Sequence, residues 1–159
     1  MISARRKWWV LLPLALMLSA CDPDIIVHDE TRAAELIVDF LDALKSPEGI
    51  ELAYAWTDDR YKETTSRAEF GRLVAEVRRR NAGADIALTG FEVFGPVETM
   101  AIYARSMGAD QVPVYFRFIL SGSKTHDYYL LQWHADESAF KTEGIYHDYP
   151  APQVVVAGV

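Results

Sequence analysis

The sequence predicts an α+β domain in which helices come first and an antiparallel sheet follows. Up to residue 83 the apolar side chains recur at helical spacing, and from residue 85 onward they alternate with a period of two. The chain has 159 residues, of which 50% are hydrophobic, so it is long enough to bury one core. We therefore expect three N-terminal helices packed on a curved antiparallel sheet of four to six strands.

Local signals place the three helices. The first is expected over residues 30–45, because its polar residues fall on one narrow stripe. Ser46 and Pro47 supply an N-cap and a first-turn proline for the second helix. Residues 57–63 form a polar connection with room for one short strand. Ser66 and Glu69 have the spacing of a capping box, which begins the third helix. That helix should turn four apolar side chains inward: Phe70, Leu73, Val74 and Val77.

The second half of the chain is predicted to form a series of strands. They are expected over residues 86–94, 97–106, 111–120, 125–134 and 140–147. Gly90 interrupts the first of them and indicates a β-bulge. The third strand is the clearest, because its apolar residues all face one way: Val112, Val114, Phe116, Phe118 and Leu120.

Residues 1–20 differ in kind from the rest of the chain. A basic cluster, Arg5 to Lys7, precedes an apolar run of ten residues that Pro13 interrupts. As a helix this run would extend about 15 Å, which is half the thickness of a membrane's hydrocarbon core. The pattern is therefore typical of a secretory signal peptide rather than of a transmembrane helix.

The end of that segment, Leu18-Ser19-Ala20-Cys21, resembles the lipobox of bacterial lipoproteins. The resemblance implies that Cys21 is lipidated on sulfur, that the signal is cut before it, and that the new amino group is acylated. Two or three acyl chains hold a protein firmly on a membrane, whereas one holds it weakly. Cys21 is also the only cysteine, so the sequence excludes an internal disulfide and a cysteine-cluster zinc site.

Charge limits the partners of the mature chain. Cleavage before Cys21 removes three basic residues and no acid, so the formal charge falls from -7 to -10. So acidic a domain lacks the basic face that phosphate binding needs, which argues against nucleic acid as a partner. Anionic headgroups repel it as well, so the lipid would hold the domain while its body stands off the bilayer. Asp22, directly after the lipidated position, resembles the signal that retains enterobacterial lipoproteins in the inner membrane.

The order of elements is similar to that of the nuclear transport factor 2-like, or cystatin-like, superfamily. Ala53-Tyr54-Ala55-Trp56, a polar turn and then Ser66 to Phe70 resemble its small bacterial lipoproteins. Residues 140–145 resemble its final strand, with Phe140 and Thr142 as departures. The resemblance covers residues 30–148 and implies a cone-shaped domain whose open end is often a pocket. Residues 1–20 are then the signal, 21–29 a tether and 149–159 a tail.

Seven residues are candidates for such a pocket. Six are aromatic, and they are equally explained as core residues, since large rings dominate any small core. Arg117 is the seventh, and it interrupts an apolar strand. It either contacts an anionic ligand or partner on the concave face, or it faces solvent between Phe116 and Phe118. The aromatic candidates are Tyr54, Phe70, Phe91, Tyr103, Tyr115 and Trp133.

No sequence motif indicates catalysis, a metal or a cofactor. Fingerprints for zinc proteases, serine hydrolases, phosphate loops and dinucleotides are all missing from the sequence. His126 and His134 would lie about 26 Å apart on one strand, too far to share a metal. We therefore expect a membrane-anchored, non-enzymatic accessory or binding module outside the cytoplasm. The alternative is a small-molecule enzyme of the ketosteroid-isomerase or polyketide-cyclase type, using a carboxylate such as Asp58, Asp59 or Asp127.

The C-terminal tail, residues 150–159, is uncharged and apolar. It is either a disordered end or an added strand at a sheet edge, in this chain or in a partner. Three consecutive valines exposed to water would promote aggregation, so the second alternative, in which the tail docks on a sheet edge, is favoured.

Overall fold

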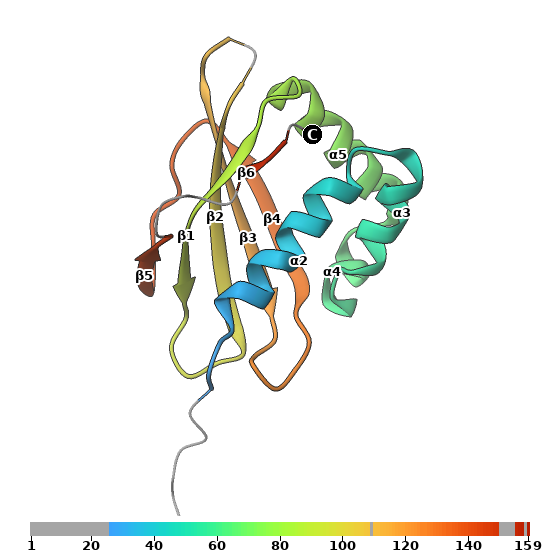
Figure 1. Cartoon of the computed structure of the whole chain (residues 1–159). Coiled ribbons are helices and arrows are strands. Elements are labelled where there is room, and N and C mark those ends of the chain that lie inside the picture. Colours follow the sequence, from blue (N-terminus) through green and yellow to red (C-terminus); the bar gives the residue numbers. More distant parts are fainter. Residues whose placement is uncertain (1–25, 109, 150–154, 158) are drawn as a thin grey trace, which may run out of the picture.

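The predicted α+β class is confirmed. The structure is a computed structural model that describes residues 26–108, 110–149, 155–157 and 159. Its helices lie on one side of an antiparallel sheet (Figure 1). The helices are α2 (Glu30–Ala43), α3 (Pro47–Ala55), α4 (Asp59–Thr64) and α5 (Arg67–Asn81). The strands are β1 (Ile86–Val93), β2 (Thr99–Met107), β3 (Pro113–Ser121), β4 (Tyr129–Asp136), β5 (Ile145–Asp148) and β6 (Val155–Val156).

Side-chain caps begin the helices where the sequence indicates. Ser46 accepts a hydrogen bond from the Gly49 N–H at the start of α3, and Ser66 accepts one from the Glu69 N–H at the start of α5. Each bond satisfies one of the N–H groups that a helix leaves unpaired at its first turn. Leu73, expected to point inward, is instead 43% exposed, because the buried face of α5 carries Phe70, Val74 and Val77.

The short helix α4 was not predicted. Residues 57–63 were expected to form a connection with at most a short strand, and only Thr57 pairs in that way, with Leu130. Asp58 caps a helix instead, by accepting hydrogen bonds from the Arg60 N–H at 2.9 Å and from its guanidinium. Burial of the Tyr61 side chain then stabilises this single turn and a half against the core.

The sheet has the order β4-β3-β2-β1-β5, and β6 pairs with the first residues of β1. The bulge expected at Gly90 is confirmed, since the register of β1 against β2 shifts between Leu88 and Gly90. The third strand begins at Pro113, so Val112 lies outside it and is 41% exposed. The expected strand over residues 140–147 is reduced to β5, and residues 137–144 cross the sheet without joining it.

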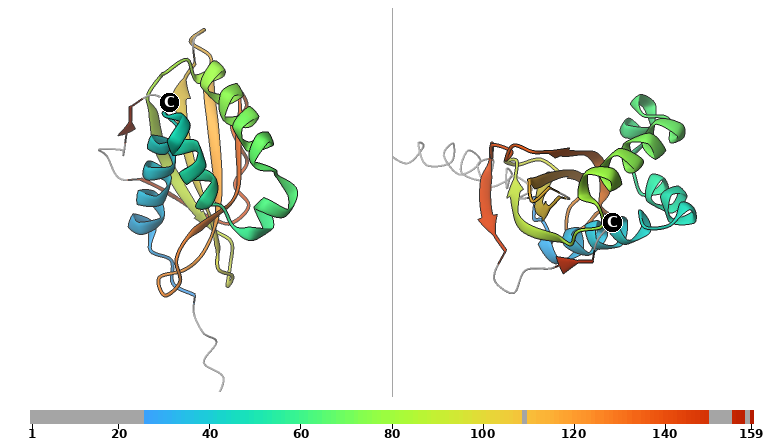
Figure 2. Two further views of the ribbon diagram at one scale, coloured as in Figure 1. Left: turned by 90° about the vertical axis from the view of Figure 1, so that its right-hand side faces the viewer. Right: turned by 90° about the horizontal axis from the view of Figure 1, so that it is seen from above.

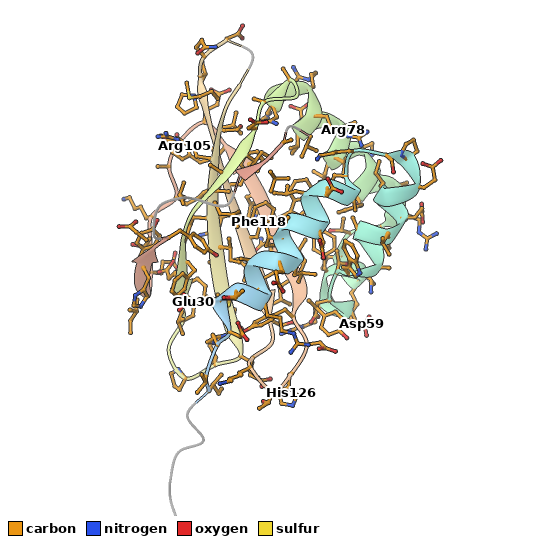
Figure 3. All side chains as sticks on the ribbon, viewed as in Figure 1. Glu30, Asp59, Arg78, Arg105, Phe118 and His126 are labelled. Atoms are coloured by element: carbon orange, nitrogen blue, oxygen red, sulfur yellow. The ribbon has the colours of Figure 1, made fainter. Side chains whose placement is uncertain are left out.

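Large rings fill the space between the helices and the sheet. Phe40 contacts Phe70, Phe118 and Trp133 edge to face, with ring centroids 5.7–6.2 Å apart. Phe116 and Phe118 stack along β3. Figure 3 shows Phe118 between the sheet and α2. This aromatic core joins α2, α5, β3 and β4 into one unit.

The chain enters the domain along the turns at one end of the sheet (Figure 1). The carbonyl of Val27 accepts a hydrogen bond from the Lys124 N–H at 2.7 Å, and the Asp29 N–H donates to the Tyr128 hydroxyl at 2.8 Å. The described end of the expected tether, residues 26–29, is therefore fastened to the hairpin between β3 and β4.

The C-terminal tail docks on the sheet of its own chain. Val155 and Val156 pair with Ala87 and Ile86 of β1, and the side chains of Val156 and Val159 are buried. This confirms the docking alternative for the described tail residues.

Replacing Val156 with serine should lower the free energy of unfolding by about 2 kcal/mol, because it puts a polar group at a buried apolar position. Chemical denaturation measures the change. Val112→Ser is the matched control and should alter stability by less than about 0.5 kcal/mol, because that side chain is exposed. Equal effects of the two variants would contradict the docked tail.

Candidate functional site

Polar side chains gather on the face of the sheet that points away from the helices, which we call the outer face. Phe116 and Phe118 point into the core, so their neighbours on β3 point outward. The strand register places Arg117 between Tyr103 of β2 and His134 of β4. One row across the outer face thus contains a phenol, a guanidinium and an imidazole.

A segment without regular structure covers this row. Residues 137–144, the connecting segment, lead from β4 at one edge of the sheet to β5 at the other. In the view from above in Figure 2 the segment passes on the side of the sheet away from α2. The ring of Phe140 lies over the guanidinium of Arg117, 5.0 Å from its carbon to the ring centroid, and the imidazole of His134 is tilted against the same ring. The cation–π contact holds the segment over the sheet.

A buried carboxylate fastens the other half of the connecting segment. Glu92 of β1 has no exposed surface. One of its oxygens accepts a hydrogen bond from the Tyr103 hydroxyl, and the other accepts the N–H groups of Glu143 and Gly144. A buried carboxylate without such donors would be strongly destabilising. The three donors therefore make Glu92 an anchor for residues 143 and 144.

The same contact determines the protonation of Tyr103. Burial and the hydrogen bond to Glu92 raise the pKa of the Tyr103 hydroxyl well above its usual value of 10.0, and the charge of Arg117 only partly opposes this. The hydroxyl therefore stays protonated at neutral pH and acts as a donor to the carboxylate.

A cavity of about 180 Å³ lies between the outer face and the connecting segment. Ala139, Phe140 and Thr142 line it from the connecting segment, and the other six lining residues belong to the strands. Gly90 makes room for one wall, because a Cβ there would collide with the ring of Tyr146. The hydroxyl of Tyr146 donates to the carbonyl of Thr89 at 3.2 Å, which fixes that ring. The strand residues in the lining are Thr89, Tyr103, Ala104, Tyr115, Phe116 and Tyr146.

Arg117 and His134 lie beside the cavity and influence each other. The Nε atom of Arg117 is buried and has no hydrogen-bond partner within the described part of the chain. Shielding from water lowers the pKa of His134 below 6.5, and the positive charge of Arg117 lowers it further. The imidazole is therefore neutral at pH 7.

The structure divides the seven pocket candidates between the two sides of the sheet. Tyr54, Phe70 and Trp133 belong to the aromatic cluster on the helical side. Phe91 stacks on His147 of β5, 4.9 Å between ring centroids. Tyr103, Tyr115 and Arg117 share the outer face. Arg117 does alternate with Phe116 and Phe118, but Phe140 covers it.

Sequence reasoning missed Glu92, Phe140 and Tyr146 as residues of this site. The signal for Glu92 is present in the sequence, since it is a charged residue among Phe91, Val93 and Phe94. The same argument singled out Arg117. Phe140 was expected within a strand rather than above one, and nothing in the sequence places it over Arg117.

The other acidic and histidine candidates have structural contacts. The hydrogen bond from the Arg60 side chain lowers the pKa of the helix cap Asp58 to about 2. His126 bonds to Glu98, 2.5 Å between Nδ1 and Oε1, at the tip of the hairpin that precedes β4. Asp127 pairs with Arg32, and Asp59 is exposed. Among the described residues no group of three His, Cys, Asp or Glu side chains is placed to hold a metal ion. Cys21 lies outside the described residues.

Comparisons with known proteins add no relatives. No family model matches the chain, and neither the curated proteins nor the solved structures contain a match. Within the described residues, no helix combines the length and apolar character needed to cross a membrane.

Replacing Glu92 with glutamine should loosen the connecting segment. The amide keeps the size of the side chain but loses one acceptor, so one of the three donors is left unpaired. We expect the free energy of unfolding to fall by about 1–3 kcal/mol. Hydrogen exchange at the N–H groups of Glu143 and Gly144 should accelerate, as mass spectrometry would show. Glu137→Gln, at an exposed position of the same segment, should leave both measurements unchanged.

Replacing Arg117 with methionine should raise the pKa of His134 toward 6.5, because a nearby positive charge is removed while the shielding from water remains. An NMR titration of the imidazole measures this shift. In the wild type the unfolded chain takes up the proton at a higher pH than the folded chain does, so His134 costs stability as the pH falls through about 6.5. Arg105→Met removes the same charge from β2 as a control. An unchanged His134 titration in Arg117→Met would show that the two groups do not interact.

Proposed function

We propose that this protein is a lipid-anchored binding module on the outer side of a bacterial cytoplasmic membrane, without enzymatic activity of its own. The observation that carries the proposal is the sequence Leu18-Ser19-Ala20-Cys21, which follows a basic and then an apolar segment and contains the only cysteine. Acylation of Cys21 would provide the membrane attachment. Asp22 favours the inner membrane as the location.

We also propose that the domain is a member of the nuclear transport factor 2-like superfamily. The support is the order of its elements: two helices, a short element, a third long helix, and then an antiparallel meander. The short element is the helix α4. Such an affiliation concerns the fold and implies no particular activity.

Two features favour binding over catalysis. The space between helices and sheet, where the enzyme alternative would place its substrate, is filled by rings with at most 7% of their surface exposed, namely Phe40, Phe70, Phe116, Phe118 and Trp133. On the outer face, the carboxylate of Glu92 is committed to three hydrogen-bond donors. A general base has to reach its substrate, and Glu92 is held by its own chain.

The cavity on the outer face is the proposed binding site. It combines apolar rings with a few hydroxyl groups, which is the usual composition of small-molecule sites. The chain enters the domain at the end that carries the β1–β2 and β3–β4 turns (Figure 1), so this end would lie nearest the membrane. The strands would then extend away from the bilayer, and the outer face would remain accessible to ligands in solution.

Replacing Cys21 with serine should release the protein from membranes or leave the precursor uncleaved, because serine cannot form the thioether to lipid. Detergent-phase partitioning and the mass of the intact protein measure the two effects. The matched control is Ser19→Thr, which keeps the thiol and should leave partitioning unchanged. Membrane partitioning of Cys21→Ser equal to that of the wild type would contradict the anchor.

A further inference from the structure

We propose that the outer-face cavity binds a sugar acid, that is, a saccharide ring that carries a carboxylate. The inference rests on the proposed binding function and names the ligand class of the same site. Three features of the cavity lead to it: the hydroxyl groups in its lining, the rings in its walls and a cation in the cavity next to it.

The lining is rich in hydroxyl groups. Five of the nine lining residues have one, namely Thr89, Tyr103, Tyr115, Thr142 and Tyr146. A hydroxyl can donate one hydrogen bond and accept others, so even the two that already donate, to Glu92 and to the Thr89 carbonyl, can still accept. A saccharide is a ring of hydroxyls with the same dual character. A purely apolar ligand would offer no partner to the other three hydroxyls, and burying them without one is costly.

The walls of the cavity are flat and apolar. The rings of Tyr103 and Tyr146 meet at 62°, with centroids 5.6 Å apart, and Phe140 lines the cavity from the connecting segment. The C–H faces of a sugar ring are apolar, whereas its rim is polar. A ring between these walls would place its faces against the aromatic rings and its rim against the hydroxyls.

A second cavity of about 330 Å³ lies next to the first one, along β1 and β2. The two share Thr89, and Arg105 of the second cavity is the cross-strand neighbour of Tyr115 in the first. Figure 3 shows Arg105 on the side of the sheet away from the helices. Arg105 takes part in none of the ion pairs found among the described residues. Asp85 lines this cavity as well and has an interaction of its own within the protein, so the guanidinium of Arg105 is the group that suits a ligand's carboxylate.

Size supports the same ligand class. The first cavity, about 180 Å³, is small enough to limit its occupant to a single ring. Small-molecule sites usually exceed about 300 Å³, so the first cavity alone is small and the pair falls in the ordinary range. The sugar ring would occupy the first cavity, and its carboxylate would extend toward Arg105 in the second cavity.

The test is binding of glucuronate, glucose and cyclohexanecarboxylate to the full chain, measured by calorimetry. The protein is kept in lauryldimethylamine oxide, because maltoside detergents contain sugar. Glucuronate should bind at least about tenfold tighter than glucose, since it adds a charged hydrogen bond to Arg105. It should also bind tighter than cyclohexanecarboxylate, which has the acid group and a ring without hydroxyls.

Two variants locate the contacts. Tyr115→Phe removes one hydroxyl and keeps the ring, so glucuronate affinity should fall about threefold to tenfold. Arg105→Gln should abolish the preference for glucuronate over glucose. Arg72→Gln, at an exposed position of α5, removes the same charge elsewhere and should change neither.

The outcomes separate the ligand class from the proposed function. No binding of either sugar, or equal binding of glucuronate and cyclohexanecarboxylate, would overturn the sugar-acid proposal. Equal binding of the two acids would still leave the cavity as a binding site. Membrane partitioning of the same preparation tests the anchor independently, so loss of the anchor with glucuronate binding intact overturns only the location.

Discussion

The outer side of this domain depends on the hydrogen bonding of Glu92. The carboxylate lies in the middle of a sheet, with none of its surface exposed, and therefore requires donors from the protein. Two of its three donors are backbone N–H groups of Glu143 and Gly144, which a regular strand would use for pairing. These bonds hold the connecting segment against the sheet, and the next strand, β5, begins only at Ile145. Gly144 permits this approach, since a Cβ there would collide with the Val93 carbonyl.

The sheet separates two environments with different roles. On the helical side, edge-to-face and stacked rings fill the interior and hold helices and strands together. On the outer side, the contacts are a cation over a ring, a phenol on a carboxylate and an imidazole beside a guanidinium. Because apolar packing stabilises the domain from one side, the other can carry charged and hydroxyl groups. The candidate site therefore lies on the face of the sheet opposite the core rather than inside the core.

Much of the fold was predictable from local patterns. The caps at Ser46 and Ser66, the bulge at Gly90 and the alternation along β3 all follow from the chemistry of a few neighbouring residues. The helix α4 was missed because its stability comes from the Asp58 cap and from burial of Tyr61, and that burial is a long-range contact. Residues 140–144 look like a strand in the sequence, but the N–H groups of Glu143 and Gly144 donate to Glu92 instead of to a neighbouring strand.

The candidate site was only partly predictable. Arg117 was a candidate because it interrupts an apolar strand. Tyr103 and Tyr115 were candidates because they are large aromatic residues. Their shared face follows from the register of β2 against β3, which the sequence does not specify. The partners that complete the site, Phe140 and Tyr146, come from segments that lie next to β1 and β3 only after the chain has folded back across the sheet.

The position of β6 affects the order in which the domain can fold. The first residues of β1 pair with Val155 and Val156, which come within the last five residues of the chain. About 70 residues separate the two strands, so this pairing closes a large loop and forms more slowly than the hairpins between neighbouring strands. During folding, that edge of β1 therefore stays open while the hairpins that join β1 to β4 are already forming.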